Sequence, residues 1–452
     1  EQEISGGALV VTSTTDNDYG ANTTTRKWTA TNLNGIIIAT DGYDTPQYWP
    51  LAAGVPSLTV PFRELRNWPD TSNKCKVIRS FRTFLVGLNW ERAGVNEPRL
   101  VKWSTEATYG NVPTTWSEAD NTLDAGEYQL ADTSGEIVDG LPLGDSFLIY
   151  KKNAIYIMNY VGTPYIFSFK LLSPNIGCLA KNCIAEFEGG HFFIGLSDFY
   201  LCNGQQVTPL LPERLRRAVF DDLDGDNDNY NKCFVAADYV RNEMIAAFPS
   251  TAGASGGPAD KAIIWNWKTN TFSMRDLPAT SHITAGIIEI VAGTQWDNIT
   301  GTWNAGSGAW GSTNYGNIAE NLVFADVTNT KLFRDNSGNT KDGTNMTSYI
   351  ERTGYDLGDP SIIKYVSAVY PELEVSGDNE IKVYVGHQMA TEEAITWDNG
   401  TNFNPDNQSK VSCRATGKYF AVKFESTGDF DWKLNGLAFD VKPRGKRGSR
   451  AY

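Results

Sequence analysis

Histidines, cysteines and clustered carboxylates most often carry the chemistry of a protein, and this chain of 452 residues has only three histidines. His191, His282 and His387 lie far apart in strand-like or turn contexts, without the spacing of a metal-binding pair. A histidine that only packs is expected at each position. The sequence also lacks HExxH, a Walker phosphate loop and a strand–GxGxxG–helix arrangement. We therefore expect no enzymatic activity, although a convergent triad of Ser and Asp residues stays open.

Carboxylates gather in one stretch, DDLDGDNDNY, where Asp222, Asp224, Asp226 and Asp228 stand close together. Closely spaced carboxylate and amide oxygens are what Ca²⁺ requires. The spacing differs from that of a helix–loop–helix calcium loop, because counting from Asp222 places glycine at position 4 instead of 6 and Cys233 at position 12. A solvated acidic loop is the favoured interpretation and a calcium site the weaker one. No other metal and no cofactor is expected.

Six cysteines are spread along the chain without a CxxC pair, so neither a zinc site nor a redox motif is indicated. Cys178 and Cys183 are close enough to suggest a disulfide, but no secretory signal is visible and reduced thiols are favoured. Most of the six are expected to be small buried residues: Cys75, Cys178, Cys183, Cys202, Cys233 and Cys413.

The charge is acidic, with 39 basic against 53 acidic residues and a formal net charge of −14. This balance argues against a protein that grips nucleic acid through a broad basic face. The acidic excess fits a surface past which a polyanion slides without sticking. A need for solubility explains the same excess equally well. No apolar run approaches the ~20 residues that cross a bilayer, so neither membrane anchoring nor secretion is expected. The first residue is Glu1, which leaves an upstream segment possible.

Strand signals dominate, because short runs rich in Val, Ile, Phe, Tyr and Trp alternate with Gly, Asn, Asp and Pro, as at 77–90, 145–162 and 185–210. Strand–turn–strand units recur about every 40–50 residues, the period of a four-stranded propeller blade. No WD, kelch or Asp-box pattern marks the blades, so an array of sandwiches is the alternative. The sequence predicts an all-β chain with a degenerate β-propeller-like body and an appended C-terminal β-sandwich-like domain.

Changes in composition along the chain predict five regions. They are an N-terminal arm or remnant of an upstream segment at 1–34, the propeller-like body at 35–290, a Gly/Asn/Thr-rich segment with a Trp repeat at 291–345, the C-terminal β domain at 346–441 and a basic flexible tail at 442–452. One short surface helix is expected at 212–223, where Pro212 suits the first turn and apolar residues recur at helical spacing.

Two sets of residues are candidates for contacts with partners. Trp296, Trp303 and Trp310 recur every seven residues, and we expect them to pack within the chain or between subunits, with a partner-binding loop as the alternative. The end of the chain is rich in basic residues that should stay flexible until bound to a partner or DNA: Lys442, Arg444, Lys446, Arg447 and Arg450.

The segment 138–210 resembles the tail nozzle proteins of short-tailed bacteriophages, also described as tail tubular or DNA-stabilisation tail proteins. The likeness lies in a strand DSFLIYKKNAIYIM, a glycine-containing link NIGC and a blade GHFFIGLSDFYLCNGQQV. The stretch 351–371, followed by VYVGHQ and GKYFAVKFES, is similar to the C-terminal β region of phage tail proteins.

The resemblance implies a structural protein of the virion tail, present in the host cytoplasm during assembly. It implies a homohexameric ring below the head-to-tail adaptor, with tail fibres or spikes held on its outside. Double-stranded DNA would be retained in the channel and pass through it without sequence-specific binding. An acidic wall would keep this DNA mobile, because a strongly attractive wall would trap it. The basic end would order against the adaptor or touch DNA.

Two hypotheses from other functional classes remain. A carbohydrate-binding or carbohydrate-cleaving β-propeller is the main alternative, because aromatic residues make up 12% of the chain and offer platforms for sugar rings. Its paired carboxylates cannot be located among 53 acidic residues. A host cell-surface adhesin ranks third, because no signal peptide is visible.

Overall fold

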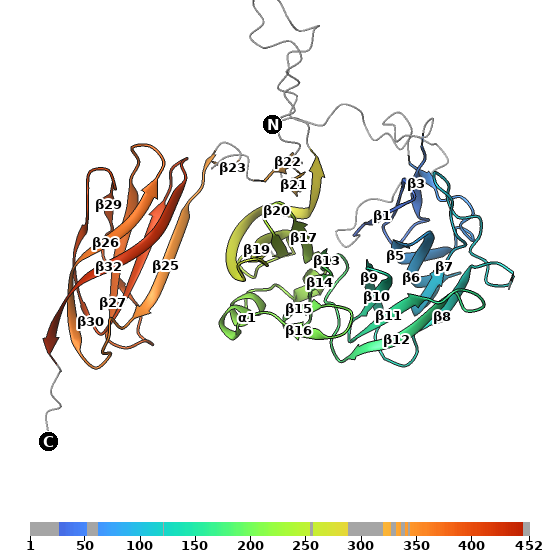
Figure 1. The fold of residues 1–452 in the computed structure, drawn as a ribbon, viewed down its shortest axis with the longest axis horizontal. Coiled ribbons are helices and arrows are strands. Elements are labelled where there is room, and N and C mark those ends of the chain that lie inside the picture. Colours follow the sequence, from blue (N-terminus) through green and yellow to red (C-terminus); the bar gives the residue numbers. More distant parts are fainter. Residues whose placement is uncertain are drawn as a thin grey trace, which may run out of the picture. The chain divides into compact units, whose positions relative to one another are not determined.

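The computed structural model describes residues 27–51, 62–120, 122–253, 256–287, 320–326, 331–335, 340–341 and 344–445. These residues belong to two compact units, one within Glu1–Asp335 and one within Asn336–Tyr452. We call the first the blade unit and the second the sandwich unit. Both are built of antiparallel strands (Figure 1).

The blade unit is a succession of small sheets, each made of strands that follow one another in the sequence. The first sheet contains β1 (Thr29–Leu33), β2 (Ile36–Thr40), β3 (Gln47–Trp49) and β4 (Arg63–Glu64). The second contains β5 (Asn73–Phe81), β6 (Phe84–Arg92), β7 (Val95–Trp103) and β8 (Gly126–Gln129). The third contains β9 (Ile137–Leu143), β10 (Ser146–Lys151), β11 (Ala154–Tyr160) and β12 (Phe167–Pro174). The fourth contains β13 (Ile184–Phe187), β14 (Gly190–Ile194), β15 (Phe199–Cys202) and β16 (Val207–Pro209).

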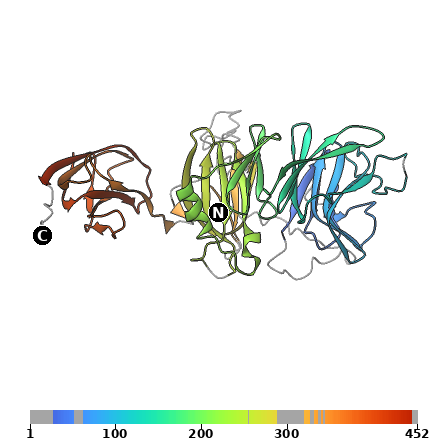
Figure 2. The same ribbon diagram turned by 90° about the horizontal axis from the view of Figure 1, so that it is seen from below.

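Successive sheets pack face to face, as the blades of a propeller do. The first strands of consecutive sheets lie next to one another, with β5 contacting β1 and β9, and β13 contacting β9 and the following β17. Figure 2 shows the same sheets from below, standing side by side. The predicted all-β, propeller-like body is therefore confirmed.

Apolar residues on both faces of the inner strands explain this stacking. All five residues of β14 are buried, and so are the first seven of β6. A strand that is buried on both faces needs a neighbouring sheet on each side. A single four-stranded sheet cannot cover its own two faces, so the sheets stack on one another. Between the first and second sheets, Trp68 stacks on Trp90 with ring centroids 4.8 Å apart and meets Trp116 edge to face at 4.9 Å.

The fifth sheet of the described part is bent, so that its own strands pack against one another. It has six strands: β17 (Phe234–Asp238), β18 (Glu243–Phe248), β19 (Ala259–Asn266), β20 (Thr271–Ile287), β21 (Glu320–Asp326) and β22 (Lys331–Arg334). Register shifts between Ala259 and Lys261 and between Thr280 and His282 bend it, and β20 contacts β17 although β18 and β19 lie between them in the sheet. Residues from β17 to β21 share one buried cluster as a result.

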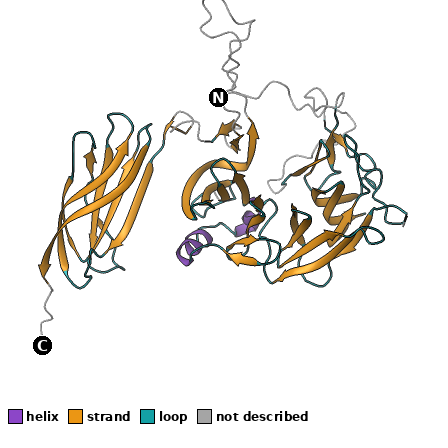
Figure 3. Cartoon of the chain, in the orientation of Figure 1, coloured by secondary structure: helices purple, strands orange, loops and turns teal. Residues whose placement is uncertain are grey.

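Helices are few in the described part, as Figure 3 shows. The predicted helix at 212–223 is present but shorter, as α1 (Glu213–Phe220), and the short 3-10 helix η1 (Asp226–Lys232) follows it. Val219 is the buried anchor of α1. Among the described residues, no helix is both long enough and apolar enough to span a membrane.

The sandwich unit packs two sheets against each other. One contains β25 (Ser348–Tyr355), β31 (Tyr419–Ser426), β27 (Ile381–Gln388) and β28 (Thr396–Trp397), with β29 (Thr401–Phe403) also paired to β27. The other contains β30 (Val411–Gly417), β26 (Ile363–Val375) and β32 (Trp432–Gly445). Two buried clusters combine residues of both sheets, so the predicted sandwich is confirmed. The short pair β23 (Thr340–Lys341) and β24 (Thr344–Asn345) precedes it.

The structure corrects two predicted boundaries. Residues 29–33, assigned to the N-terminal arm, form β1 of the first sheet. Residues 442–445, assigned to the flexible tail, belong to β32, where Lys442 pairs with Tyr365 and the Arg444 guanidinium lies 4.6 Å from the centroid of that ring. The boundary between the two units falls after Asp335, inside the predicted Trp-repeat segment. All six cysteines are buried free thiols, as predicted.

Because the cores of the two units are separate, a cavity in one should destabilise that unit alone. Phe147 in the blade unit and Phe424 in the sandwich unit are both at most 2% exposed. We expect Phe147→Ala and Phe424→Ala each to cost about 3–5 kcal/mol and to lower different transitions in a calorimetric scan. One transition lowered by both substitutions would contradict the division.

Candidate functional site

The most connected group of polar side chains lies where the first strands of the sheets meet. We call it the hub and define it as Lys27, Arg79, Asp139, Lys181 and Asn182. Arg79 comes from β5 and Asp139 from β9, whereas Lys181 and Asn182 lie in the link between β12 and β13. No sequence pattern predicts this group, because its members are up to 155 positions apart and match no motif.

Arg79 and Asp139 form the ion pair at the centre of the hub. The guanidinium meets the carboxylate in a forked arrangement, with Nη2 2.9 Å from Oδ1 and 3.0 Å from Oδ2, and the Asp139 side chain is 1% exposed. Arg79 also donates to the carbonyls of Ala30 and Gly140 at 3.1 Å each. One side chain of the second sheet thus binds the first and third, and a desolvated, forked pair of this kind is strongly directional.

Asn182 extends the network to the fifth sheet. Its backbone N–H donates to Asp139 Oδ2 at 2.9 Å, and its carbonyl accepts from the N–H of Val235 in β17 at 2.8 Å. Its side-chain amide donates to the carbonyl of Trp28 at 2.9 Å. Lys27, just before β1, donates to the carbonyls of Lys181 and Cys233. These bonds join the start of the first sheet to the start of the fifth.

Cations outnumber carboxylates in the hub, and burial makes its two lysines less basic. Burial lowers the pKa of Lys181 to about 8, partly offset by the charge of Asp139. Burial also lowers the pKa of Lys27. Lys181 donates to the carbonyl of Lys76 at 3.0 Å, so carbonyl dipoles rather than carboxylates hold these ammonium groups. The hub is filled by protein groups that satisfy one another, which is the arrangement of a structural centre.

A third ammonium group, outside the hub, is buried without a carboxylate among its hydrogen-bond partners. Lys151, at the end of β10, is fully buried and donates to the carbonyls of Leu130 and Thr133 at 3.1 and 2.6 Å and to Thr133 Oγ1 at 2.8 Å. Burial lowers its pKa to about 8. The three oxygens fix the segment between β8 and β9 against β10.

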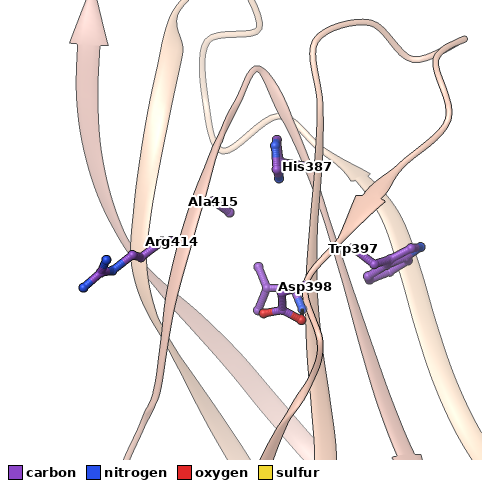
Figure 4. A pocket seen from close by; sticks show the side chains of 6 residues that line it. His387, Trp397, Asp398, Arg414 and Ala415 are labelled. Carbon is purple, nitrogen blue, oxygen red and sulfur yellow. Dashed lines mark hydrogen bonds between the residues drawn. The ribbon is translucent and has the colours of Figure 1, made fainter.

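The sandwich unit contains a cavity of about 190 Å³. It is lined by Val385, His387, Trp397, Asp398, Arg414 and Ala415. Figure 4 shows His387 and Asp398 between the strand that carries Arg414 and the one that carries Trp397. Asp398 Oδ1 accepts from the backbone N–H groups of Val385 and Gly400, each at 3.0 Å, so this oxygen holds the loop after β28. The sequence analysis treated His387 only as a packing residue and did not find this group.

Of the other two histidines, His191 is buried and His282 is exposed. His191 Nδ1 lies 3.0 Å from the Tyr150 hydroxyl and Nε2 lies 2.9 Å from the carbonyl of Pro142, which uses both ring nitrogens. Burial lowers the pKa of His191 to about 4, so its ring is neutral near pH 7. Packing is the role that the surroundings of His191 support.

The acidic stretch places its carboxylates in separate local interactions. Asp222 pairs with Lys261 at 2.7 Å and accepts from Thr251 at 3.0 Å. Asp224 accepts from the N–H of Asp226 and from the Asn229 side chain. Asp226 and Asp228 lie exposed in η1. In the described part of the chain no three His, Cys, Asp or Glu side chains gather as a metal site would require.

The letters of a nucleophile elbow occur once, as GASGG at 253–257, and the sequence analysis overlooked them. That motif works on a sharp turn from a strand into a helix. Here the segment connects the antiparallel strands β18 and β19, and residues 254–255 lie outside the described ranges. The local topology does not match that of the motif.

Most of the predicted partner residues cannot be placed. Trp296, Trp303 and Trp310 lie outside the described residues, as do Lys446, Arg447 and Arg450. Lys442 and Arg444 are part of β32, as described above.

Comparisons with known proteins give only distant structural likenesses. No family model matches the chain, and no curated protein matches it. Among solved structures, Hsv2 of Kluyvelomyces marxianus is similar over 54% of this chain and 59% of its own, with 7% identity and a TM-score of 0.30. Hsv2p of Kluyveromyces lactis covers 57% and 67%, with 8% identity and a TM-score of 0.30. The N-terminal domain of Nup159 covers 68% and 73%, with 9% identity and a TM-score of 0.35.

Neutralising Asp139 tests the role of the hub. In Asp139→Asn the side chain keeps its shape, but the Arg79 guanidinium loses its counter-charge while it stays buried. We expect a loss of about 3–5 kcal/mol in the free energy of unfolding of the blade unit, measured with urea. The control is Asp145→Asn, because Asp145 is fully exposed where it pairs with Arg82. Equal free energies of unfolding for the two variants would contradict the proposed contribution of the buried pair to stability.

The pH dependence of stability tests the burial of Lys151. Between about pH 8 and its ordinary pKa of 10.5, folded Lys151 loses its proton while the unfolded chain keeps it, so the wild type gains stability as pH rises. Lys151→Met removes this gain and strands three oxygen acceptors. The wild type should therefore be the more stable at pH 7, and by a wider margin at pH 9.5, in urea titrations.

Lys152→Met is the matched control, because Lys152 is only partly buried, with 42% of its side chain exposed, and pairs with Glu136 at 2.8 Å. Its pKa is raised by that hydrogen bond, so its contribution should not grow between pH 7 and 9.5. Buried thiols oppose the gain above about pH 9, but they are present in all three proteins and cancel in the differences. A constant margin between the wild type and Lys151→Met would contradict the shift.

Proposed function

We propose that this chain is a structural protein of a phage virion, the tail nozzle of a short-tailed bacteriophage. Copies would form a ring, a homohexamer, below the head-to-tail adaptor. The channel of the ring would hold genomic double-stranded DNA and conduct it during ejection. The outside would hold fibres or spikes. The protein would be located in the virion tail, and in the host cytoplasm during assembly.

The observation that carries this proposal is the fold of the segment that resembles nozzle proteins. Residues 138–210 span the sheets β9–β12 and β13–β16, two consecutive blades with the link between them. Gly177 in that link lies against the β10–β11 turn, where an added Cβ would stand 2.2 Å from the carbonyl oxygen of Lys151. The segment that resembles nozzle proteins thus coincides with two whole sheets and their link. Close packing in that link requires Gly177.

The filled hub favours a building block over a catalyst. Arg79 and Asp139 bind each other and four of the five described sheets are tied to them directly or through Asn182. Side chains occupy the place where the first strands meet, which stiffens the blades relative to one another. A protein that must keep its shape around DNA under load benefits from such stiffness.

The charge of both units fits DNA passage without capture. Lys and Arg number 25 and Asp and Glu 37 before Asn336, and the corresponding numbers from Asn336 onward are 14 and 16. Neither unit therefore has the net positive charge that drives release of counterions from a duplex. In this proposal the basic end, from Lys442 to Arg450, meets the adaptor or DNA locally.

A carbohydrate-binding or carbohydrate-cleaving β-propeller is the second candidate. The exposed aromatic residues favour it, since Tyr109 and Tyr165 are 75% and 78% exposed. It ranks second because the hub, where the blades converge, is filled by side chains that bind one another.

Oligomeric state tests the proposal. We expect light scattering and negative-stain images of the complete chain, alone or with its adaptor, to show a sixfold ring whose channel admits duplex DNA. A chain that ends at Gly445 keeps β32 whole and removes three basic residues, so it should form the same ring and isolate their effect on adaptor binding. A persistent monomer with and without the adaptor would contradict the proposal.

A further inference from the structure

The outer face of the five-stranded sheet in the sandwich unit carries a row of three aromatic side chains. Directly opposite residues of an antiparallel pair share a face. Tyr349 of β25 pairs with Glu425 of β31, which pairs with Lys382 of β27, and Tyr384 pairs with Lys423. Trp397 of β28 pairs with Gly386 of β27, two residues beyond Tyr384 on the same face. The row therefore crosses the whole sheet.

Glycines let two of these rings lie down on the sheet. A Cβ on Gly386 would stand 2.9 Å from Cε3 of Trp397, and a Cβ on Gly400 would stand 2.7 Å from Cε1 of Tyr384. The rings cover backbone that carries no side chain, a packing that also stabilises glycines in sheets. The rings therefore lie flat against the sheet and present their faces, rather than their edges, to a ligand.

The most exposed member of the row is at the open edge. Tyr349 is 61% exposed, and every residue from Ser348 to Arg352 is exposed although β25 is a sheet strand. The ring lies near a cation, with Lys423 Nζ 4.9 Å from its centroid. A large aromatic side chain in this position leaves one face free for a partner.

Lys423 links the two tyrosines and sets their spacing. Its Nζ lies 4.9 Å from the centroid of Tyr349 and 5.4 Å from that of Tyr384, so the two centroids are no more than about 10 Å apart. That is roughly the span of two linked sugar rings. Tyr384 is held in turn, because its hydroxyl donates to Glu425 Oε1 at 3.3 Å and Lys382 Nζ lies 5.1 Å from its centroid.

The charges between the platforms balance. Lys382 and Lys423 contribute two ammonium groups, and Glu351 and Glu425 contribute two carboxylates, on the same face. Lys423 and Glu425 form an ion pair. Such a set can donate to and accept from hydroxyl groups without preferring a charged ligand. Neutral sugars offer hydroxyl groups at the ring edge and apolar C–H groups on the ring face.

We propose that this face, defined by Tyr349, Tyr384 and Trp397, binds a neutral polysaccharide chain. Sugar rings would stack on the tyrosines, with hydroxyls reaching the charged groups between them. Trp397 forms the other end of the row. The assignment concerns the sandwich unit and does not depend on ring formation.

Affinity electrophoresis of the complete chain tests the assignment. The gels contain hydroxyethylcellulose, dextran or mannan as neutral probes and polygalacturonate as an acidic one. We expect at least one neutral probe to retard the wild type and the Tyr349→Ala/Tyr384→Ala variant to bind it at least tenfold more weakly. Tyr349→Phe/Tyr384→Phe keeps both rings and should be retarded nearly as much as the wild type.

Two controls separate binding from folding. Tyr370→Ala removes a tyrosine that is 40% exposed on β26 of the other sheet, and it should leave retardation unchanged. If the double variant lowers the melting transition of the sandwich unit, the single variant Tyr349→Ala at the exposed edge replaces it. No retardation of the wild type by the three neutral probes, retardation by polygalacturonate alone, or full binding by Tyr349→Ala would each overturn the assignment.

Discussion

The ion pair between Arg79 and Asp139 is the interaction on which the arrangement of the blades depends. Each sheet of the blade unit is held internally by its own ladder of hydrogen bonds, but those ladders do not fix one sheet against the next. Arg79 binds the first and third sheets, and Asp139 binds Asn182, which reaches the fifth. Because these bonds are buried and shared, the loss of one charge leaves several polar groups unsatisfied.

This constraint shapes what the protein can do. A centre filled by its own side chains leaves surfaces and edges, rather than the axis of the blades, for contacts with other molecules. The fifth sheet bends so that β20 contacts β17, and its strands share one buried core. A self-contained blade unit joined to a separate sandwich suits the proposed component of a larger assembly, in which the sandwich would present the proposed sugar-binding face.

The strands and fold class could be predicted from the sequence, because alternation and apolar-aromatic runs between turn residues report directly on local structure. The hub could not, since Arg79 and Asp139 are 60 positions apart and each alone resembles an ordinary strand residue. The end of β32 was missed because Pro443 and Gly445 look like breakers, whereas pairing with the long strand β26 extends to both. The aromatic row was missed because it depends on register, which placed Trp397 opposite Gly386.

The proposed role as a phage tail protein is tested most directly by locating this chain in purified phage particles. Immunogold labelling with antibodies against the sandwich unit locates it by electron microscopy of purified virions. The proposal predicts gold at the tail end of intact particles. Particles without label, with the chain found only in the lysate, would contradict it.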